Sequence, residues 1–461
     1  RFDLDFNFKE KIDDEIEFEK AKTKYKWFKF KGEEYVVEGL KVAPNLLGKL
    51  VLKKKRVTYK YNWFLGGYNK TTKLLAKVKP QDDAGRKFWY YRHAEYDNTG
   101  NVMVITGVMD KIGRNMDANR QAKEFHMLKF DKDVKLLSDT KLLFDHPQSI
   151  VSSATLAPEV DADGFTTDEG YDYILVFAPK FIKKTKEQAT NYTYVRLSTD
   201  GEVKERISFT SPNGIWNAEN IMEDKKGNIH VFGPANDNTD KFFSASDFPK
   251  KFLNFQIMKV SDGKVAYITA TNLDEFEAKM KAPVGQKKNP AYKGKKFSLA
   301  TADVLTNGDL IITGQNNKST KEGTIYKDVL MFHFDAKGVL KSQYGVVKQE
   351  RGKDSNAVPV NQHIIESADG KSFYWTIMEI KGLRANKELG TAKLKVLNYP
   401  SVAKVSIADA SIGEFKTFGE GKYFLNDLMP LLPIRSKGAK LLFFGENKKG
   451  SELWFGRMPL D

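Results

Sequence analysis

The chain has 461 residues and a formal net charge of +15, from 75 lysine and arginine residues against 60 aspartate and glutamate residues. It contains no cysteine, which excludes disulfides, thiolate metal sites and cysteine nucleophiles. No apolar run is long enough to cross a bilayer as a helix. The excess positive charge favours an acidic partner, such as an anionic glycan, an anionic lipid, a nucleic acid or an acidic protein.

The first residue is Arg1 rather than methionine, so we expect that residues precede it, either a signal peptide that was removed or a further part of the chain. The first alternative implies an exported protein, in the periplasm or at the cell surface in association with an outer membrane. Residues 1–20, RFDLDFNFKEKIDDEIEFEK, are typical of a hairpin whose strands complete the last sheet of a closed ring.

Residues 24–84 are expected to form an irregular β-unit. Within it, residues 51–79 interleave basic residues with aromatic ones such as Tyr59, Tyr61 and Trp63. This mixture suits stacking on bases or sugars with contact to phosphate or carboxylate. The alternation is also that of an ordinary strand with packed aromatics, which is the interpretation that the pattern favours.

A nine-residue stretch, TNGDLIITG at 306–314, has near-copies at 98–107 (NTGNVMVITG) and 225–233 (KKGNIHVFG). An Asn-Gly or similar turn between two apolar runs predicts a β-hairpin. A second hairpin follows each copy, as in LMFHFDAKGVLKSQYGVV at 330–347. Two consecutive hairpins make a four-stranded antiparallel meander, the repeating unit of a β-propeller.

The sequence therefore predicts an all-β fold, a single β-propeller domain over 1–461 with about seven blades, six or eight being alternatives. The regular blades are expected at 86–146, 148–211, 213–272, 296–349, 356–419 and 421–461. A basic insertion at 273–295 separates two of them.

These meanders resemble the kelch, NHL and WD types of propeller. The Lys-rich, cysteine-free, long-bladed pattern is also similar to uncharacterised exported propellers of Bacteroidota-type bacteria. The chain lacks the Trp-Asp dipeptide of the WD type and the double glycine of the kelch type. The resemblance implies a propeller fold and no particular catalytic residues.

The longer connections between strands and the 273–295 insertion hold much of the positive charge and are expected to share one face. Lysine is also common on any surface, and this second interpretation stays open. The candidate binding residues are Lys183, Lys184, Lys287, Lys288, Lys295 and Lys296.

The first strand of each blade should line the central channel, and its polar residues are candidates for chemistry. An acidic-polysaccharide hydrolase or lyase would need a carboxylate or imidazole beside an arginine. The residues of those types are Arg92, Glu95, Glu219 and His363. Channel residues of this kind are also commonly a water-filled lining.

Oxygen ligands gather around a Gly164 turn, as in part of a calcium loop, at Asp161, Asp163, Asp168 and Glu169. Their register departs from that of a complete loop, which favours an acidic surface turn. The six histidines show no paired ligand spacing, so neither a metal nor a cofactor is expected.

The sequence favours a non-catalytic binding or assembly scaffold of a bacterial cell envelope, which would dock an acidic protein or an anionic polymer on its basic loops. The alternative is the hydrolase or lyase. Nucleic acid ranks below both because no nucleic-acid-binding module is present. The chain could also be one subunit of a larger envelope complex.

Overall fold

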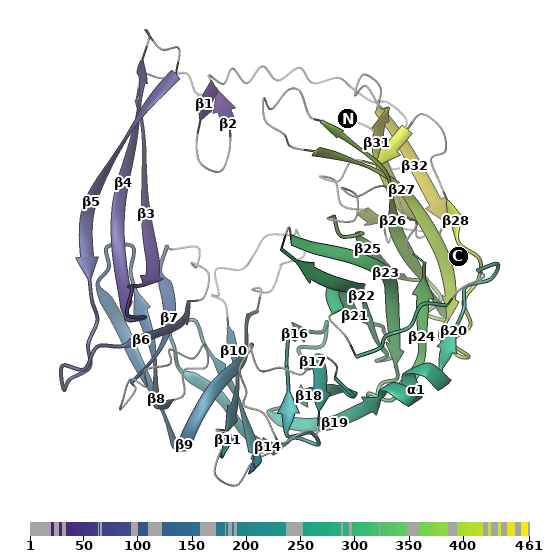
Figure 1. Cartoon of the computed structure of the whole chain (residues 1–461), viewed down its shortest axis with the longest axis horizontal. Helices are drawn as coiled ribbons and strands as arrows, with labels where there is room; N and C mark the ends of the chain where they lie inside the picture. The colour runs from purple at the N-terminus through teal and green to yellow at the C-terminus, as the bar shows by residue number, and fades with distance from the viewer. Residues whose placement is uncertain are drawn as a thin grey trace. The chain divides into compact units, whose positions relative to one another are not determined.

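The computed structural model shows the chain as a succession of antiparallel sheets (Figure 1). The described residues are 20–22, 27–29, 34–62, 64, 67–93, 100–108, 122–156, 172–179, 181–182, 187–188, 191–236, 252–286, 289–294, 297–321, 323–347, 358–385, 394–417, 423–425, 432–434, 440–447 and 453–459. Among them, no helix has both the length and the apolar character that a bilayer crossing would require.

Internal contacts divide the chain into two compact units. The first comprises residues 1–210 with 239–248, and the second comprises residues 211–238 with 249–461. Each unit has its own sheets and its own hydrophobic clusters.

The first unit contains a three-stranded sheet of long antiparallel strands, β3 (Glu34–Pro44), β4 (Leu50–Asn62) and β5 (Gly67–Val78). At the turn between β3 and β4, the Asn45 side chain accepts hydrogen bonds from the amides of Leu47 (2.8 Å) and Lys49 (3.0 Å). Near the turn between β3 and β4, one face of this sheet is apolar and packs into a core cluster. Because side chains alternate between the faces of a strand, the lysines between these apolar positions lie on the other face.

The same unit contains a seven-stranded sheet. In spatial order its strands are β14 (Val203–Thr210), β13 (Asn191–Leu197), β10 (Tyr173–Pro179), β9 (Leu136–Thr155), β8 (Ala122–Phe130), β7 (Val102–Val108) and β6 (Trp89–His93). Two further pairs are short: β1 (Lys20–Lys22) with β2 (Trp27–Lys29), and β11 (Phe181–Ile182) with β12 (Glu187–Gln188).

The second unit begins with two five-stranded sheets. The first holds β15 (Ile215–Trp216), β16 (Asn220–Glu223), β17 (Ile229–Asn236), β18 (Asn254–Ser261) and β19 (Lys264–Asn272). The short helix α1 (Leu273–Ala278) follows. The second sheet holds β21 (Phe297–Val304), β22 (Leu310–Thr320), β23 (Gly323–Phe334), β24 (Leu340–Val346) and, parallel to β24, β20 (Met280–Lys281).

An eight-stranded sheet completes this unit. Its strands are β25 (Gln362–Glu366), β26 (Ser372–Ala385), β27 (Leu394–Ser406), β28 (Lys416–Thr417), β29 (Tyr423–Leu425), β30 (Leu432–Ile434), β31 (Lys440–Asn447) and β32 (Leu453–Pro459).

The repeated hairpin turn is present where the sequence predicts it. Gly308 has a φ of 93° and its amide bonds the carbonyl of Leu305 at 2.8 Å. Gly227 has a φ of 78° and makes the same bond to Asp224 at 3.0 Å. Because positive φ is readily adopted only by glycine, these two positions fix the turns between the first and second strands of their meanders.

The third strand of each meander carries a basic residue between two apolar ones. This residue pairs with the second residue of the second strand in the first four meanders and with the third residue in the last. The five residues are Lys129, Arg196, Lys259, His333 and Lys404. In the first four meanders the register with the fourth strand shifts directly after this residue. The meanders therefore share a β-bulge as well as a turn.

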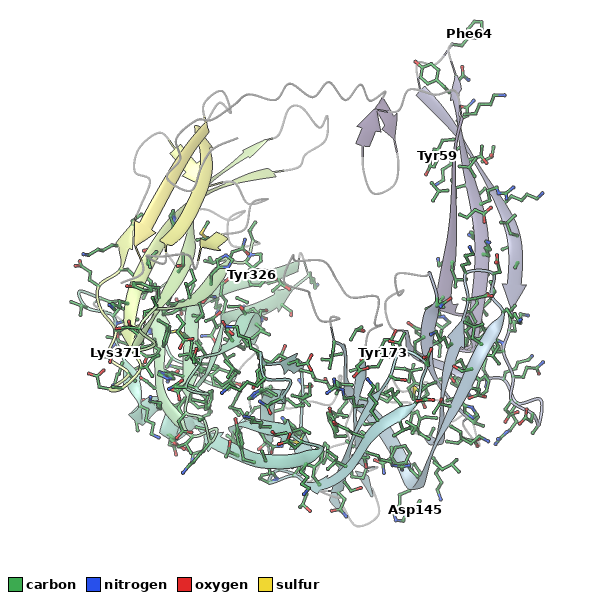
Figure 2. All side chains as sticks on the ribbon, turned by 180° about the vertical axis from the view of Figure 1, so that it is seen from behind. Tyr59, Phe64, Asp145, Tyr173, Tyr326 and Lys371 are labelled. Atoms are coloured by element: carbon green, nitrogen blue, oxygen red, sulfur yellow. The ribbon has the colours of Figure 1, made fainter. Side chains whose placement is uncertain are left out.

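The hydrophobic clusters of the second unit lie between successive meanders. Figure 2 draws the side chains of the strands as sticks. In the second unit, one cluster joins Ile311 and Met331 to Phe373 and Trp375 of the next sheet. Another cluster joins Phe255 of β18 to aromatic residues of the next sheet, including Phe332 of β23. Apolar side chains on both faces explain why the middle strands, such as β7 and β10, are buried throughout.

The prediction of an all-β fold built from antiparallel four-stranded units is confirmed. One detail differs: separate strands were expected on either side of residues 146–148, but β9 runs through both positions. It pairs with β8 in its first part and with β10 in its second, so two meanders share one strand. The single domain, the number of blades and the closure of a ring by residues 1–20 stay predictions.

Candidate functional site

A pocket of about 350 Å³ lies in the second unit, where β21 contacts β25. These are the first strands of neighbouring sheets. The polar residues that line the pocket are Ser298, Thr301, Gln315, Tyr326, Asn361, Gln362 and His363. Ligand pockets commonly have a volume of about 300–1,000 Å³ and a few convergent polar groups, so this pocket is the candidate site.

Two buried glutamines hold the pocket walls together. The Gln315 side chain accepts a hydrogen bond from the amide of Val360 at 2.6 Å and donates one to the carbonyl of Lys327 at 2.8 Å. The Gln362 side chain donates to the carbonyl of Gly314 at 3.0 Å and accepts from the Trp375 indole at 3.0 Å. The side-chain amides of both glutamines therefore have their hydrogen bonds within the protein, and one bond of each joins the two sheets at the pocket.

A β-bulge shapes the opposite wall. The register between β21 and β22 shifts between Leu299 and Thr301, which leaves Ala300 unpaired in the ladder. A Cβ atom on Gly314 would lie 2.2 Å from the Ser298 carbonyl oxygen, so β22 can approach β21 this closely only with a glycine there. The bulge places both Ala300 and Thr301 along the pocket.

His363 has the most distinctive environment of the lining residues. It is half-buried, and burial lowers the pKa of its imidazole below the usual 6.5. The ring is therefore neutral at neutral pH, with one nitrogen that donates and one that accepts a hydrogen bond. Directly across the ladder, the Thr376 hydroxyl is buried and has no hydrogen-bond partner among the described residues.

Other polar groups at the pocket are also available to a ligand. Among the described residues, none hydrogen-bonds the side chains of Thr301, Asn361 or His363. The lining contains no lysine, arginine, aspartate or glutamate. The pocket can therefore satisfy an uncharged, hydrogen-bonding molecule, and the neutral imidazole can accept a hydrogen bond or a proton from it.

The four residues predicted for hydrolase chemistry are not brought together by the described structure. His363 lines the pocket, whereas Glu219 does not and instead accepts a hydrogen bond from Asn217. The Arg92 side chain and Glu95 lie outside the described residues.

The remaining predicted site residues lie outside the described part of the chain as well. These are Lys183, Lys184, Lys287, Lys288, Lys295 and Lys296 of the basic loops, and Asp161, Asp163, Asp168 and Glu169 of the calcium-like segment. Their predicted roles stay predictions.

Three histidines inside strands are buried and bonded to carboxylates. The imidazole nitrogens lie 2.7 Å from Asp139 for His126, 3.1 Å from Asp224 for His230, and 2.7 Å from Asp309 for His333. No group of three or more described histidine, aspartate or glutamate residues could hold a metal ion. These histidines therefore serve the fold, as their positions in strands indicate.

The sequence pointed to His363 but not to Thr301, Tyr326 or Ser298. These three lie on β21 and β23, and the pocket forms only where β21 meets the next sheet. The β-bulge at Ala300 marks this part of the pocket, but a bulge can be located only when the pairing of its two strands is known, and the sequence does not give that pairing.

The sequence matches no protein-family model and no curated protein. Among solved structures, a variant of the Synechocystis apocarotenoid oxygenase matches 93% of this chain and 90% of its own, with 10% identity and a TM-score of 0.32. The lignostilbene dioxygenase of Pseudomonas brassicacearum matches 92% of this chain and 86% of its own, with 9% identity and a TM-score of 0.33. At these TM-scores the likeness assigns neither a substrate nor a reaction to this chain.

These matches correct three expectations. The matching structures are oxygenases, so the resemblance to kelch, NHL or WD propellers and to exported Bacteroidota-type propellers is wrong. Both matching structures are oxygenases and neither is a scaffold, so the prediction of a non-catalytic envelope scaffold, with the interaction and envelope roles attached to it, is withdrawn. The alternative, a hydrolase or lyase of acidic polysaccharide, differs from both oxygenases and is also withdrawn.

Proposed function

We propose that the protein binds a small, uncharged, hydroxyl-rich molecule, such as a neutral mono- or disaccharide, in the pocket between β21 and β25. The observation that carries this proposal is the uncharged polar lining around a half-buried, neutral His363. A residue whose pKa is shifted by burial, in a pocket with convergent polar groups, is a typical feature of a binding or active site.

The chemistry of the lining favours hydroxyl groups over carboxylates. A hydroxyl both donates and accepts a hydrogen bond, which matches the hydroxyl of Thr301, the amide of Asn361 and the imidazole of His363. A carboxylate would lose its hydration without a cation among the lining residues to replace it. Neutral sugars are therefore expected to bind in this pocket, and their uronic acid counterparts are not.

Titration calorimetry with maltose, cellobiose and lactose, and with digalacturonate as the charged comparison, tests the proposal. His363→Ala and Thr301→Val each remove one hydrogen-bonding group and are expected to weaken binding about fivefold to tenfold. His146→Ala is the matched control, since His146 is an exposed histidine of β9 in the first unit.

The thermal unfolding midpoint of each variant establishes that it is folded. Binding that is unaffected by His363→Ala and by Thr301→Val in folded protein would contradict the proposal. A preference for digalacturonate over the neutral disaccharides that is lost in the folded His363→Ala variant, and therefore belongs to this pocket, would do so too.

A further inference from the structure

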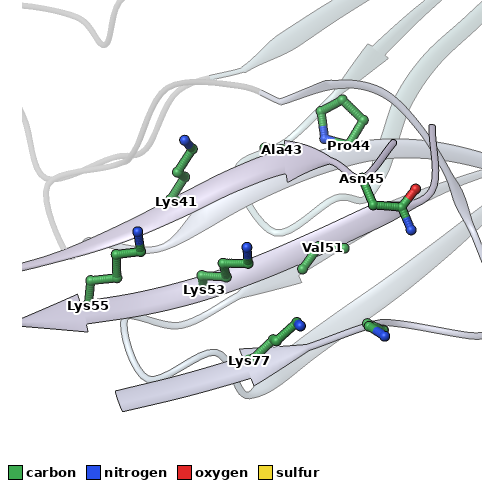
Figure 3. A pocket seen from close by; sticks show the side chains of 9 residues that line it. Lys41, Ala43, Pro44, Asn45, Val51, Lys53, Lys55 and Lys77 are labelled. Carbon is green, nitrogen blue, oxygen red and sulfur yellow. The ribbon is translucent and has the colours of Figure 1, made fainter. Parts of the chain in front are cut away.

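The three-stranded sheet of the first unit has two faces of opposite character. On one face Val42, Leu50 and Leu52 are buried in a core cluster. On the other face a groove of about 290 Å³ is lined by Lys41, Lys53, Lys55, Lys77 and Lys79 around a buried Val51. Figure 3 shows lysine side chains rising from neighbouring strands beside this groove, which we call the lysine groove.

The strand register places lysines directly opposite one another on neighbouring strands. Lys53 of β4 pairs with Lys41 of β3 on one side and with Lys77 of β5 on the other. Neighbouring strands lie about 4.8 Å apart, so three ammonium groups are arranged in a row across the sheet. Like charges directly opposite each other destabilise a sheet, which makes this row costly unless an anion neutralises it.

Two basic residues of the opposite face, Lys54 and Arg56, are paired with an acidic residue. Glu38 forms ion pairs with Lys54 at 3.0 Å and with Arg56 at 2.6 Å. Between Glu38 and Asp82 the sequence has eleven lysine and arginine residues and no acidic residue. Within the described part of the chain, the five groove lysines form no ion pair.

We propose that the lysine groove binds an anionic glycan that carries closely spaced carboxylate or sulfate groups. This proposal is independent of the pocket between β21 and β25. The row of ammonium groups fits a chain with one negative charge on each sugar ring. The lining contains no aromatic residue, so the stacking platform that single-stranded nucleic acids require is absent from this groove.

The test is a charge reversal, Lys53→Glu with Lys77→Glu, measured with oligogalacturonate as the probe at physiological ionic strength. The expected result is a loss of affinity of at least about tenfold, since two attractive contacts become repulsive. The matched control is Lys60→Glu with Lys73→Glu, which changes the net charge equally on exposed residues of the same sheet outside the groove. This control should lower the affinity less than about twofold.

Lys53→Ala with Lys77→Ala is a milder variant that stays informative if the reversal prevents folding, and it should lower the affinity in the same direction. Equal losses in the groove and control variants would show attraction by net charge alone and would overturn the proposal. Tighter binding of polyglutamate or of a single-stranded thymidine oligonucleotide than of oligogalacturonate, at the same salt concentration, would overturn its assignment to a glycan.

Discussion

The lysine groove and the pocket between β21 and β25 are similar in volume but differ in charge. The groove, in the first unit, is lined by five lysines, whereas the pocket, in the second unit, has no charged lining residue. Both arise from the same alternation of side chains along antiparallel strands. The comparison shows that strand register, rather than fold class, decides which side chains line each region.

The largest expected effect is the difference in the free energy of unfolding between substitutions on the two faces of the three-stranded sheet. Leu52 is completely buried and Lys53, the next residue, lies in the lysine groove. Leu52→Ala should lower the free energy of unfolding by about 2–5 kcal/mol, because it leaves a cavity in the core. Lys53→Ala should change it by less than about 0.5 kcal/mol. Denaturant unfolding measures both, and equal losses would contradict the assignment of the two faces.

The second largest expected effect is the difference between the two sites in how strongly ligand binding depends on ionic strength. Raising the salt concentration from about 50 to 200 mM screens exposed charges, so oligogalacturonate binding to the groove should weaken about tenfold. Binding of a neutral disaccharide to the pocket should change by less than about twofold. Calorimetry at the two salt concentrations compares them. A neutral ligand with the stronger salt dependence would contradict both assignments.

The smallest expected effect is a difference in pH response between the units. Burial tends to lower the pKa of His126, but the hydrogen bonds that its ring donates to the carboxylates of Asp139 and Glu124 outweigh burial and raise the pKa. Burial lowers the pKa of His230 and His333 despite their carboxylate partners. A raised folded pKa stabilises the protein below the unfolded value of about 6.5, and a lowered one destabilises it there.

Acidification from pH 8 to pH 6 should therefore raise the free energy of local opening of β8 and lower that of β17 and β23, in each case by about 1 kcal/mol or less. Hydrogen exchange of peptides from these strands, corrected for intrinsic exchange rates, measures the local opening. The same direction of change in all three strands would contradict the histidine environments described above.

The sequence predicted the local features of the fold well. Turns at Gly227 and Gly308 follow from glycine next to a short polar loop between apolar runs, because hairpin geometry depends on a few adjacent residues. The continuity of β9 was missed because the turn signal near residues 146–148 does not show whether the chain bends there.

The sites depended on information that a single strand does not carry. The sequence placed the candidate binding charges on the loops, and the structure adds a charged groove on a sheet. In that groove Lys77 lies opposite Lys53 only because Leu75 is unpaired in a β-bulge. His363 was named from its residue type, but its neighbours come from another sheet. The Asp309 and His333 pair likewise joins residues 24 positions apart.

The central claim is that His363 is a neutral ligand-binding group in an uncharged pocket. An NMR pH titration of the histidine ring protons, with and without a neutral disaccharide, tests it most directly. We predict a His363 pKa below about 6.5, and a resonance that moves on addition of the disaccharide while that of His146 stays in place. A His363 pKa at or above this value, or a resonance unchanged by every neutral disaccharide tested, would contradict the claim.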